Sequence, residues 1–307
     1  MKLVDMEKKL PVAVIILTKD EERHIERCVR NVLQISDEVY VVDSESTDRT
    51  CEIAERFGAT VVEHPWPGNQ AEQFNWALDN LPVRAEWILR LDADEYLLPE
   101  LVEELREKLP AMPEDVSALS LSLSRCFCGR VLRHGIVNNI RIVRIFRKGK
   151  ARYERRIMDE HLTILDGRTV EMKHQFIDDN RLPLGEFVTK HNQYASREAA
   201  LLLDAEYGLS DHAAQAGGHG AEVERKRAQK ARYARMPLFW RAFAYFIYRY
   251  IVKLGFLDGR EGFLWDFLQG WWYRTLVDAK VLEIKRKSGE DREKIIEILS
   301  REYGIKL

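Results

Sequence analysis

The sequence contains little cysteine, no marked excess of either charge and no long apolar run. Its four cysteines form no Cys-x-x-Cys pair, so neither a zinc site nor a disulfide framework is expected, and reduced thiols are the default. Lysine and arginine number 48 against 50 for aspartate and glutamate, so no overall field predicts a nucleic-acid partner. No stretch offers the roughly 18 uninterrupted apolar residues of a membrane span, and the N-terminal apolar run is too short for a signal peptide. We therefore expect a cytosolic protein.

The glycine-rich fingerprint Gly-x-Gly-x-x-Gly is also missing after the first apolar run. Residues 11–18 lead instead into Thr-Lys-Asp-Glu-Glu at positions 18–22. Dinucleotide-binding enzymes need those glycines for a tight turn and for close approach of the backbone to the pyrophosphate. Their absence argues against NAD or FAD as a cofactor.

Apolar runs and helical repeats alternate along the first third of the chain. Four runs predict strands, at positions 11–18, 38–42, 59–63 and 86–91, and the first is typical of a buried parallel strand. The segments between them have helical spacing or helix-capping residues, and this rhythm predicts a parallel, Rossmann-like sheet with crossover helices. Two further strands are predicted at 116–124 and 141–147. Arg144 and Arg147 in the second are interpreted as part of a solvated strand face, with phosphate contact as the alternative.

Acidic side chains follow two of the predicted parallel strands. Asp43 follows the second, and Asp92 and Asp94 follow the fourth. Ligands bind beyond the carboxyl ends of the strands in open α/β sheets. Two carboxylates one residue apart can share Mg²⁺ or Mn²⁺ that holds a diphosphate, because these cations prefer oxygen ligands. A charged turn after a buried strand is the alternative for this pair.

Three motifs in this order resemble glycosyltransferase family 2: ILTKDEE at 16–22, VVDSESTDRT at 41–50 and LDADE at 91–95. They are most similar to the branch that contains lipopolysaccharide-core glucosyltransferase-like enzymes. The resemblance covers about the first two thirds of the chain. It implies a GT-A fold, which is a Rossmann-like mixed sheet with flanking helices. It also implies inverting transfer of a sugar from a nucleotide-diphosphate donor, with a UDP-sugar favoured and with Mn²⁺ or Mg²⁺ as cofactor.

The resemblance also implies roles for individual residues. Thr18 and Asp43 would face the nucleoside, while Asp92 and Asp94 would face the ribose, the diphosphate and the metal. The residues expected to bind the donor are Thr18, Glu21, Asp43, Gln70, Asn75, Arg90, Asp92 and Ala93. The expected metal ligands are Asp92, Asp94 and His174. Ordinary helix-surface amides are the alternative for Gln70 and Asn75, and a structural histidine is the alternative for His174.

A second acidic cluster lies at residues 155–161 (RRIMDEH). Inverting transfer needs a base that takes the proton of the acceptor hydroxyl, and a carboxylate in a desolvated pocket serves well. The family carries an acid at this point, often preceded by histidine, whereas here Asp159 stands in place of that histidine. We expect Glu160 to be the base, with Asp159 as the alternate. An exposed acid patch paired with Arg155 and Arg156 is the competing interpretation.

The composition changes past Tyr194. We expect a catalytic domain over residues 1–205, a flexible glycine-rich loop over 206–222 and a helical, membrane-associating region over 223–307. Six arginines and lysines crowd into 225–235, and an aromatic-rich helix follows. A helical wheel places on one side Phe239, Phe243, Phe246, Ile247, Tyr250 and Leu254, and on the other Arg241, Tyr245, Tyr248, Arg249 and Lys253. This pattern is typical of an amphipathic helix lying in the plane of an anionic membrane surface. A hairpin packed on the catalytic domain or across a homodimer is the alternative.

These features predict a metal-dependent hexosyltransferase, peripheral on the inner face of the cell membrane, that acts on a lipid-linked or lipopolysaccharide-type glycan. A phosphohydrolase using Asp92-x-Asp94 is one alternative, although that chemistry normally places its motif earlier and without Glu95 after it. A nucleotidyltransferase would need a glycine- and arginine-rich first loop. A non-catalytic membrane adaptor of the same fold is the remaining alternative.

Overall fold

The structure is a computed structural model that describes residues 9–137, 140–154, 162–209, 233 and 236–305. The chain divides into two compact units. Unit 1 comprises Met1–Arg133 and Val137–Arg181, and unit 2 comprises His134–Ile136 and Leu182–Leu307.

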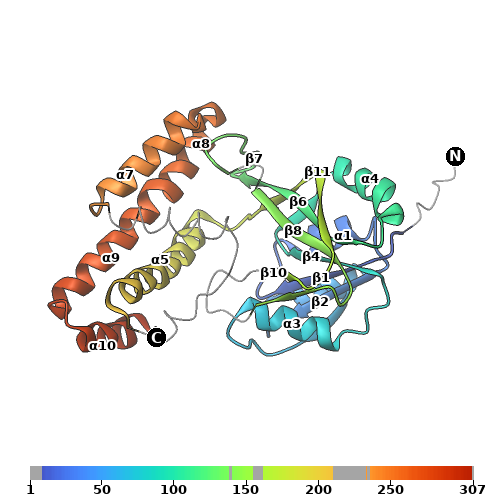
Figure 1. The fold of residues 1–307 in the computed structure, drawn as a ribbon, viewed down its shortest axis with the longest axis horizontal. Coiled ribbons are helices and arrows are strands. Elements are labelled where there is room, and N and C mark those ends of the chain that lie inside the picture. The colour runs from blue at the N-terminus through green and yellow to red at the C-terminus, as the bar shows by residue number, and fades with distance from the viewer. Residues whose placement is uncertain (1–8, 138–139, 155–161, 210–232, 234–235, 306–307) are drawn as a thin grey trace. The chain divides into compact units, whose positions relative to one another are not determined.

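Unit 1 begins with a parallel half-sheet in the strand order β3-β2-β1-β4. The strands are β1 (Val12–Thr18), β2 (Glu38–Asp43), β3 (Thr60–Glu63) and β4 (Trp87–Asp92). They are connected by the helices α1 (Ile25–Val32), α2 (Thr50–Arg56) and α3 (Gln70–Asn80). The predicted Rossmann-like arrangement is therefore confirmed (Figure 1).

A second half of mixed direction extends this sheet beyond β4 in the order β8-β6-β11-β5. Its strands are β5 (Glu95–Leu97), β6 (Val116–Phe127), β8 (Ile140–Arg147) and β11 (Arg168–Asp179), and β7 (Arg130–Val131) pairs with β6. Helix α4 (Pro99–Lys108) and the short turn η1 (Leu109–Ala111) precede β6, while β9 (Ala151–Tyr153) and β10 (Leu162–Ile164) form a separate pair. β5 follows β4 after two residues yet pairs with β11 at the far end of this order. The sheet therefore curls, as in a GT-A fold.

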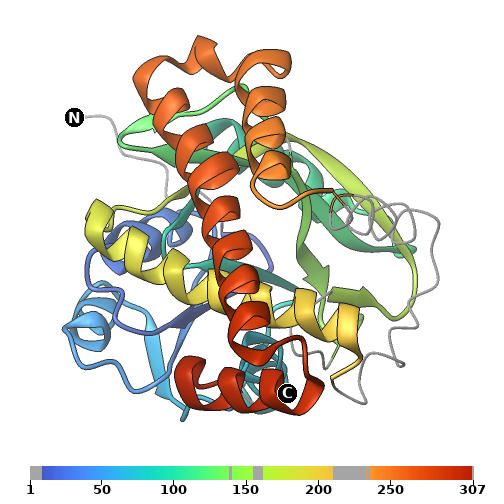
Figure 2. The same ribbon diagram turned by 90° about the vertical axis from the view of Figure 1, so that its left-hand side faces the viewer.

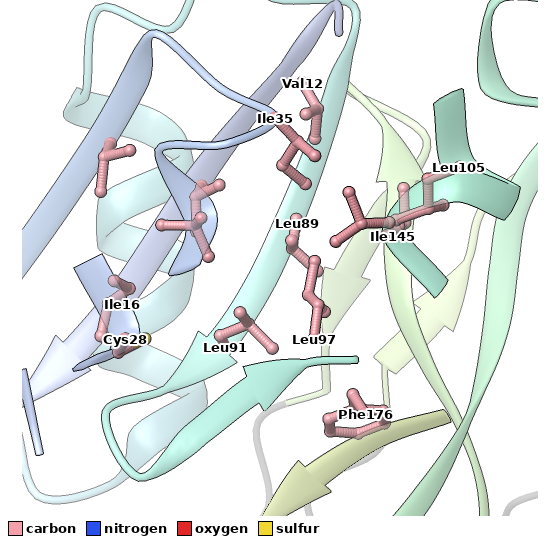
Figure 3. Close-up of a cluster of buried hydrophobic side chains, with 14 of the residues drawn as sticks. Val12, Ile16, Cys28, Ile35, Leu89, Leu91, Leu97, Leu105, Ile145 and Phe176 are labelled. Carbon is pink, nitrogen blue, oxygen red and sulfur yellow. The ribbon is translucent and has the colours of Figure 1, made fainter. Parts of the chain in front are cut away.

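Helices cover both faces of the parallel strands, which explains their continuous apolar sequences. Alternate residues of β1 enter different cores: Val12, Val14 and Ile16 pack with α1 and α4, while Ala13 and Ile15 pack with α3. Figure 3 shows the first of these cores, where side chains from β1 and β4 lie among those of α1, α4 and β11. This packing on two sides positions the carboxyl ends of β1, β2 and β4.

Unit 2 is helical. Helices α5 (Leu184–Tyr207) and α9 (Tyr273–Ser288) pack along one another, and α10 (Arg292–Tyr303) packs at one end (Figures 1 and 2). Between them lies a core formed by Ala195, Ala199, Ala200, Leu203, Val277, Val281, Ile284, Ile295 and Leu299. The remaining elements are α7 (Trp240–Ile247), η3 (Tyr248–Val252), η4 (Gly255–Asp258), α8 (Gly259–Trp265) and η5 (Asp266–Trp272). Within the described ranges, no helix is both long and apolar enough to cross a bilayer.

The helical wheel of residues 239–254 is wrong for several side chains. Phe246 is only 7% exposed, because this stretch folds back onto η5 and α9. Arg241 and Arg249, predicted on the polar side, are buried and form ion pairs with Asp278 and Asp266 at 2.8 Å from Nε to Oδ1. A wheel shows which side chains share a side of one helix, but not which side a neighbouring helix covers.

Candidate active site

The first and second motifs meet where β1 and β2 end. The parallel register places Thr18 of β1 beside Asp43 of β2. Asp43 is fully buried and accepts three hydrogen bonds, from Thr18 Oγ1 at 2.7 Å, Ser46 N at 2.7 Å and Ser46 Oγ at 2.6 Å. These bonds fix the loop that follows β2. Contact of Thr18 and Asp43 with a nucleoside stays a prediction.

The loops after β1 and β2 are also joined to one another by hydrogen bonds. Asp20 N donates to Ser46 Oγ and Asp20 Oδ1 accepts from Thr47 N, both at 2.7 Å. Glu21 N donates to Thr50 Oγ1 at 2.7 Å. The two loops therefore form one structural unit, in which many polar residues of the motifs bind other motif residues. Glu21, predicted at the donor, also contacts the ring of His24 through Oε2, at 2.6 Å from Nδ1.

The third motif forms the turn between β4 and β5, beside the first two motifs. Leu17 of β1 pairs with Asp92, so all three motifs lie at the same edge of the sheet. The Asp92 side chain is 37% exposed, and its backbone N–H donates to Glu95 Oε2 at 3.0 Å. Asp94 Oδ2 accepts from Asn180 Nδ2 at 3.1 Å. Two partly accessible carboxylates therefore lie at the end of β4 and in the turn after it.

The Asp92–Asp94 turn has the chemistry of a cation site shared with a ligand. Desolvation, together with the charges of Asp178 and Asp92, raises the pKa of Asp94 to about 6. A cation would relieve this crowding, and carboxylate oxygens suit Mg²⁺ or Mn²⁺. In the described part of the chain, no group of three or more His, Cys, Asp or Glu side chains is arranged to hold a metal ion. Asp92 and Asp94 would therefore supply only part of the ligand set of such a cation, and its further ligands would have to come from a bound ligand or water.

Arg144 stabilises this turn through contacts with two of its acidic residues. The prediction that Arg144 lies on a solvated strand face is therefore wrong. Arg144 is 6% exposed, forms an ion pair with Glu95, which is 2% exposed, and places Nη2 at 3.3 Å from Asp92 Oδ2. Leu119 pairs with Ile145 but Ser120 pairs with Val143, so Arg144 is the extra residue of a β-bulge in β8. Bulges redirect side chains and are frequent next to active sites.

Comparison with known protein families shows to which family the chain with these three motifs belongs. Residues 13–167, about half of the chain and all three motifs, match the model of Glycosyl transferase family 2. The chain belongs to glycosyl transferase family 2.

Relatives of this family 2 chain include a Rickettsia typhi glycosyltransferase, 29% identical over 90% of this chain and 88% of the relative. The lipopolysaccharide core biosynthesis glycosyltransferase LpsC of Rhizobium meliloti is 25% identical over 62% of this chain and 71% of its own. The chain matches about a third of the length of several other rickettsial glycosyltransferases. Among solved structures, glucosyl-3-phosphoglycerate synthase of Mycobacterium tuberculosis in complex with Mn²⁺, UDP and glucosyl-3-phosphoglycerate is 23% identical. The match covers 36% of this chain and 43% of that protein, with a TM-score of 0.32.

Two predicted donor residues of this family 2 chain contact each other beside Asp92. Arg90 is 6% exposed, and its guanidinium lies over the ring of Tyr153 at 4.6 Å from the centroid. Its Nη2 lies 3.1 Å from Gln70 Oε1 and 3.7 Å from Asp92 Oδ1. Gln70 is exposed at the first turn of α3. Arg90 thus connects Gln70 to the acidic turn.

Asn75 and Ala93 were also predicted to bind the donor, but their side chains contact other parts of the protein. Asn75 Nδ2 donates to Tyr153 O at 2.9 Å, and its Oδ1 accepts from Tyr153 N at 3.0 Å. The Asn75 amide therefore attaches β9 to α3. Ala93 is 3% exposed and packs in the core, so donor contact at this residue would have to come from its backbone.

His174 is not brought to the Asp92–Asp94 turn. It lies in β11, and its backbone N–H donates to Glu104 Oε2 of α4 at 2.9 Å. The residue of β11 that bonds Asp94 is Asp179, whose N–H donates to Asp94 O at 3.0 Å. The two positions are five residues apart, which corresponds to roughly 16 Å of extended strand. The structure therefore lends no support to His174 as a metal ligand.

The end of β11 supplies residues that the sequence interpretation missed. Asn180 bonds Asp94, and Asp179 forms an ion pair with Arg27 of α1. Arg27 Nη2 also donates to Asp94 O at 3.0 Å. The sequence contains a pattern that could have identified them, because Asp-Asp-Asn at 178–180 directly follows a strand-like run, as Asp92 does. The candidate bases Asp159 and Glu160 lie outside the described residues.

Arg144→Met should lower the free energy of unfolding by about 3–5 kcal/mol, because it leaves the buried Glu95 carboxylate without its counterion. Adding Glu95→Gln should restore most of the loss, since the isosteric amide removes that charge. Urea unfolding of wild type and of the two single and one double variants measures the coupling. A double variant no more stable than Arg144→Met would show that the pair does not act as a unit.

Proposed function

We propose that this chain transfers a hexosyl group, with inversion, from a nucleotide-diphosphate sugar to a glycan acceptor. The observation that carries the proposal is the pair of partly accessible carboxylates, Asp92 and Asp94, at the end of β4 in a family 2 chain. Ligands of open α/β sheets bind at this edge. The loops after β1 and β2 end there too, which favours a nucleoside site beside the diphosphate site.

The chemistry divides among a few side chains. Asp92 and Asp94 would hold Mn²⁺ or Mg²⁺, which would neutralise the diphosphate as its bond to the anomeric carbon breaks. Arg144 and Glu95 keep Asp92 in place, through the ion pair and the backbone hydrogen bond described above. Glu160, or Asp159 as the alternate, would take the proton of the acceptor hydroxyl while its oxygen attacks the anomeric carbon from the far side. Attack opposite the leaving group inverts the configuration.

The acceptor we propose is a lipid-linked or lipopolysaccharide-type glycan at the cytoplasmic face of the cell membrane. Two observations support it. LpsC, a relative over 62% of this chain, is named for lipopolysaccharide core biosynthesis. The C-terminal third also combines six basic residues at 225–235 with an aromatic-rich helical segment. A lipid-linked acceptor keeps its sugar near the bilayer surface, so peripheral attachment would bring the enzyme to its substrate.

Incubation with UDP-, GDP- and TDP-sugars tests the donor. Family 2 chemistry predicts slow release of free nucleoside diphosphate from one of these, with Mn²⁺ present and not with EDTA. A phosphohydrolase would instead release inorganic phosphate from a simple phosphate monoester, and an adaptor would do neither. Failure of every nucleotide-sugar to bind or hydrolyse in Mn²⁺ would overturn the proposal.

A further inference from the structure

Unit 2 gathers exposed apolar side chains around the turn between α7 and α8. More than half of the exposed large apolar side chains in the described ranges lie between positions 239 and 263. Near the turn, Ile251 is 49% exposed, Val252 61%, Leu254 45% and Leu257 49%. We call residues 247–257 the apolar tip. Within unit 2, the tip and α10 lie at opposite ends (Figures 1 and 2). Exposed apolar patches of this kind mark binding surfaces.

The fold of the apolar tip is complete without these side chains. Backbone N–H groups at Lys253, Leu254 and Leu257 donate to carbonyls within the tip at 2.9–3.2 Å. Arg249 of the tip forms a buried ion pair with Asp266 of η5. The exposed side chains are therefore not an unfinished core. A turn whose backbone is hydrogen-bonded internally can also enter an apolar medium at lower cost than one that needs water.

The charge around the apolar tip is positive. Lys253 lies within it and Arg260 just after it, and both are exposed. The acids of segment 236–272 are buried or half-buried: Asp258 at 3% exposure, Asp266 at 1%, and Glu261. The surface therefore presents apolar and basic side chains without a fully exposed acid in this described segment. This combination complements an anionic lipid surface, where each nearby basic residue contributes about 1 kcal/mol.

The shape of the apolar tip distinguishes a bilayer from a second protein copy. Ile251 and Val252 are successive residues of η3, a π-helical segment, so their side chains point in different directions. Both are exposed, and so are Leu254 and Leu257 after the turn. The apolar exposure thus extends in several directions, apart from the side where Gly135 N–H donates to Lys253 O at 3.0 Å. A flat dimer interface would cover one side of it, whereas the acyl boundary of a bilayer accepts apolar side chains from all sides.

We infer that the apolar tip inserts into the interfacial region of an anionic bilayer, with Lys253 and Arg260 at the level of the lipid phosphates. The insertion is by the end of a helical hairpin, and it replaces the in-plane helix that the sequence pattern predicted. This inference deepens the proposed function, since its purpose rests on a lipid-linked acceptor. Binding to lipid is nevertheless measurable without donor or acceptor.

Sedimentation of the full chain with vesicles tests the insertion. We expect the chain to sediment with phosphatidylcholine vesicles that contain phosphatidylglycerol, and more weakly with phosphatidylcholine alone. Ile251→Ser/Val252→Ser/Leu257→Ser should reduce binding to the mixed vesicles by at least about tenfold, because it removes the three most exposed apolar side chains of the tip. Lys253→Gln/Arg260→Gln should remove the preference for anionic vesicles. Phospholipids brominated in the acyl chains should quench the fluorescence of a tryptophan placed in the tip by Phe256→Trp, at a position that is 42% exposed.

Two matched controls remove exposed apolar side chains elsewhere: Leu165→Ser in unit 1, 61% exposed, and Ile296→Ser in α10, 37% exposed. Both should bind vesicles like wild type, and circular dichroism checks that every variant is folded. Wild-type binding that the triple variant retains would overturn the inference. The inference would also be overturned if the wild-type chain did not bind vesicles but formed a dimer that the triple variant does not form. The tip would then be the contact with a second copy of the chain. Nucleotide-sugar hydrolysis by the triple variant should equal that of wild type, so failure here is distinguishable from failure of the proposed function.

Discussion

Asp94→Asn is expected to lower sugar transfer by a factor on the order of 10³ or more, since cation neutralisation of the departing diphosphate contributes several kcal/mol. The amide keeps the shape of the side chain but removes the charge that a divalent cation requires. The fold should survive, because desolvation, together with the charges of Asp178 and Asp92, already raises the pKa of Asp94 to about 6. Turnover with purified acceptor and thermal unfolding measure the two effects. Asp92→Asn should behave alike in turnover.

Asp37→Asn is the matched control for Asp94→Asn. Asp37 is exposed and directly precedes β2, at the edge of the sheet opposite Asp43. This control should retain wild-type turnover and stability. Near-full turnover of Asp94→Asn would remove Asp94 from the active site.

Glu160→Gln is expected to slow the chemical step by about 10² to 10⁴, the usual contribution of a positioned general base. Donor affinity should stay near that of wild type, because the base acts on the acceptor. The expectation rests on the sequence, since Glu160 lies outside the described residues. Single-turnover kinetics and calorimetric titration of the donor separate the two quantities.

Asp159→Asn is the companion variant of Glu160→Gln. If Glu160 is the base, Asp159→Asn should slow the chemical step less than Glu160→Gln does. The reverse order of effects would transfer the role to Asp159. A collapse of donor affinity in Glu160→Gln would identify a donor-binding or structural residue. Unchanged rates in both variants would exclude this segment as the source of the base.

The parallel half of unit 1 could be predicted from the sequence because its signals are local. Each strand is a mainly apolar run that ends on a polar residue, and helices cover both faces. The placement of Asp43 and Asp92 at one edge follows from parallel direction alone. Beyond β4 the signals stop being local. β5 is three residues long and follows β4 after two residues, yet it pairs with β11, some eighty positions later in the sequence.

The missed site residues depend on such long-range geometry. Arg144 is three residues from Arg141 and from Arg147, so strict alternation already separates it from both. Its burial against Glu95, however, needs the bulge in β8, which only the register with β6 reveals. Asn180 was recognisable as a polar residue after a strand, but its contact with Asp94 needs the pairing of β11 with β5.

The central claim is that Asp92 and Asp94 hold a divalent cation together with the diphosphate of the donor. Calorimetric titration of UDP in Mn²⁺ and in EDTA, with wild type and Asp94→Asn, tests it most directly. Shared coordination couples the binding of the two ligands. UDP should therefore bind wild type at least about tenfold more tightly in Mn²⁺ than in EDTA, and UDP should raise the affinity for Mn²⁺ by the same factor. Asp94→Asn should lose both gains. Tight binding of UDP to wild type with equal affinity in Mn²⁺ and EDTA, or an undiminished gain in Asp94→Asn, would contradict the claim.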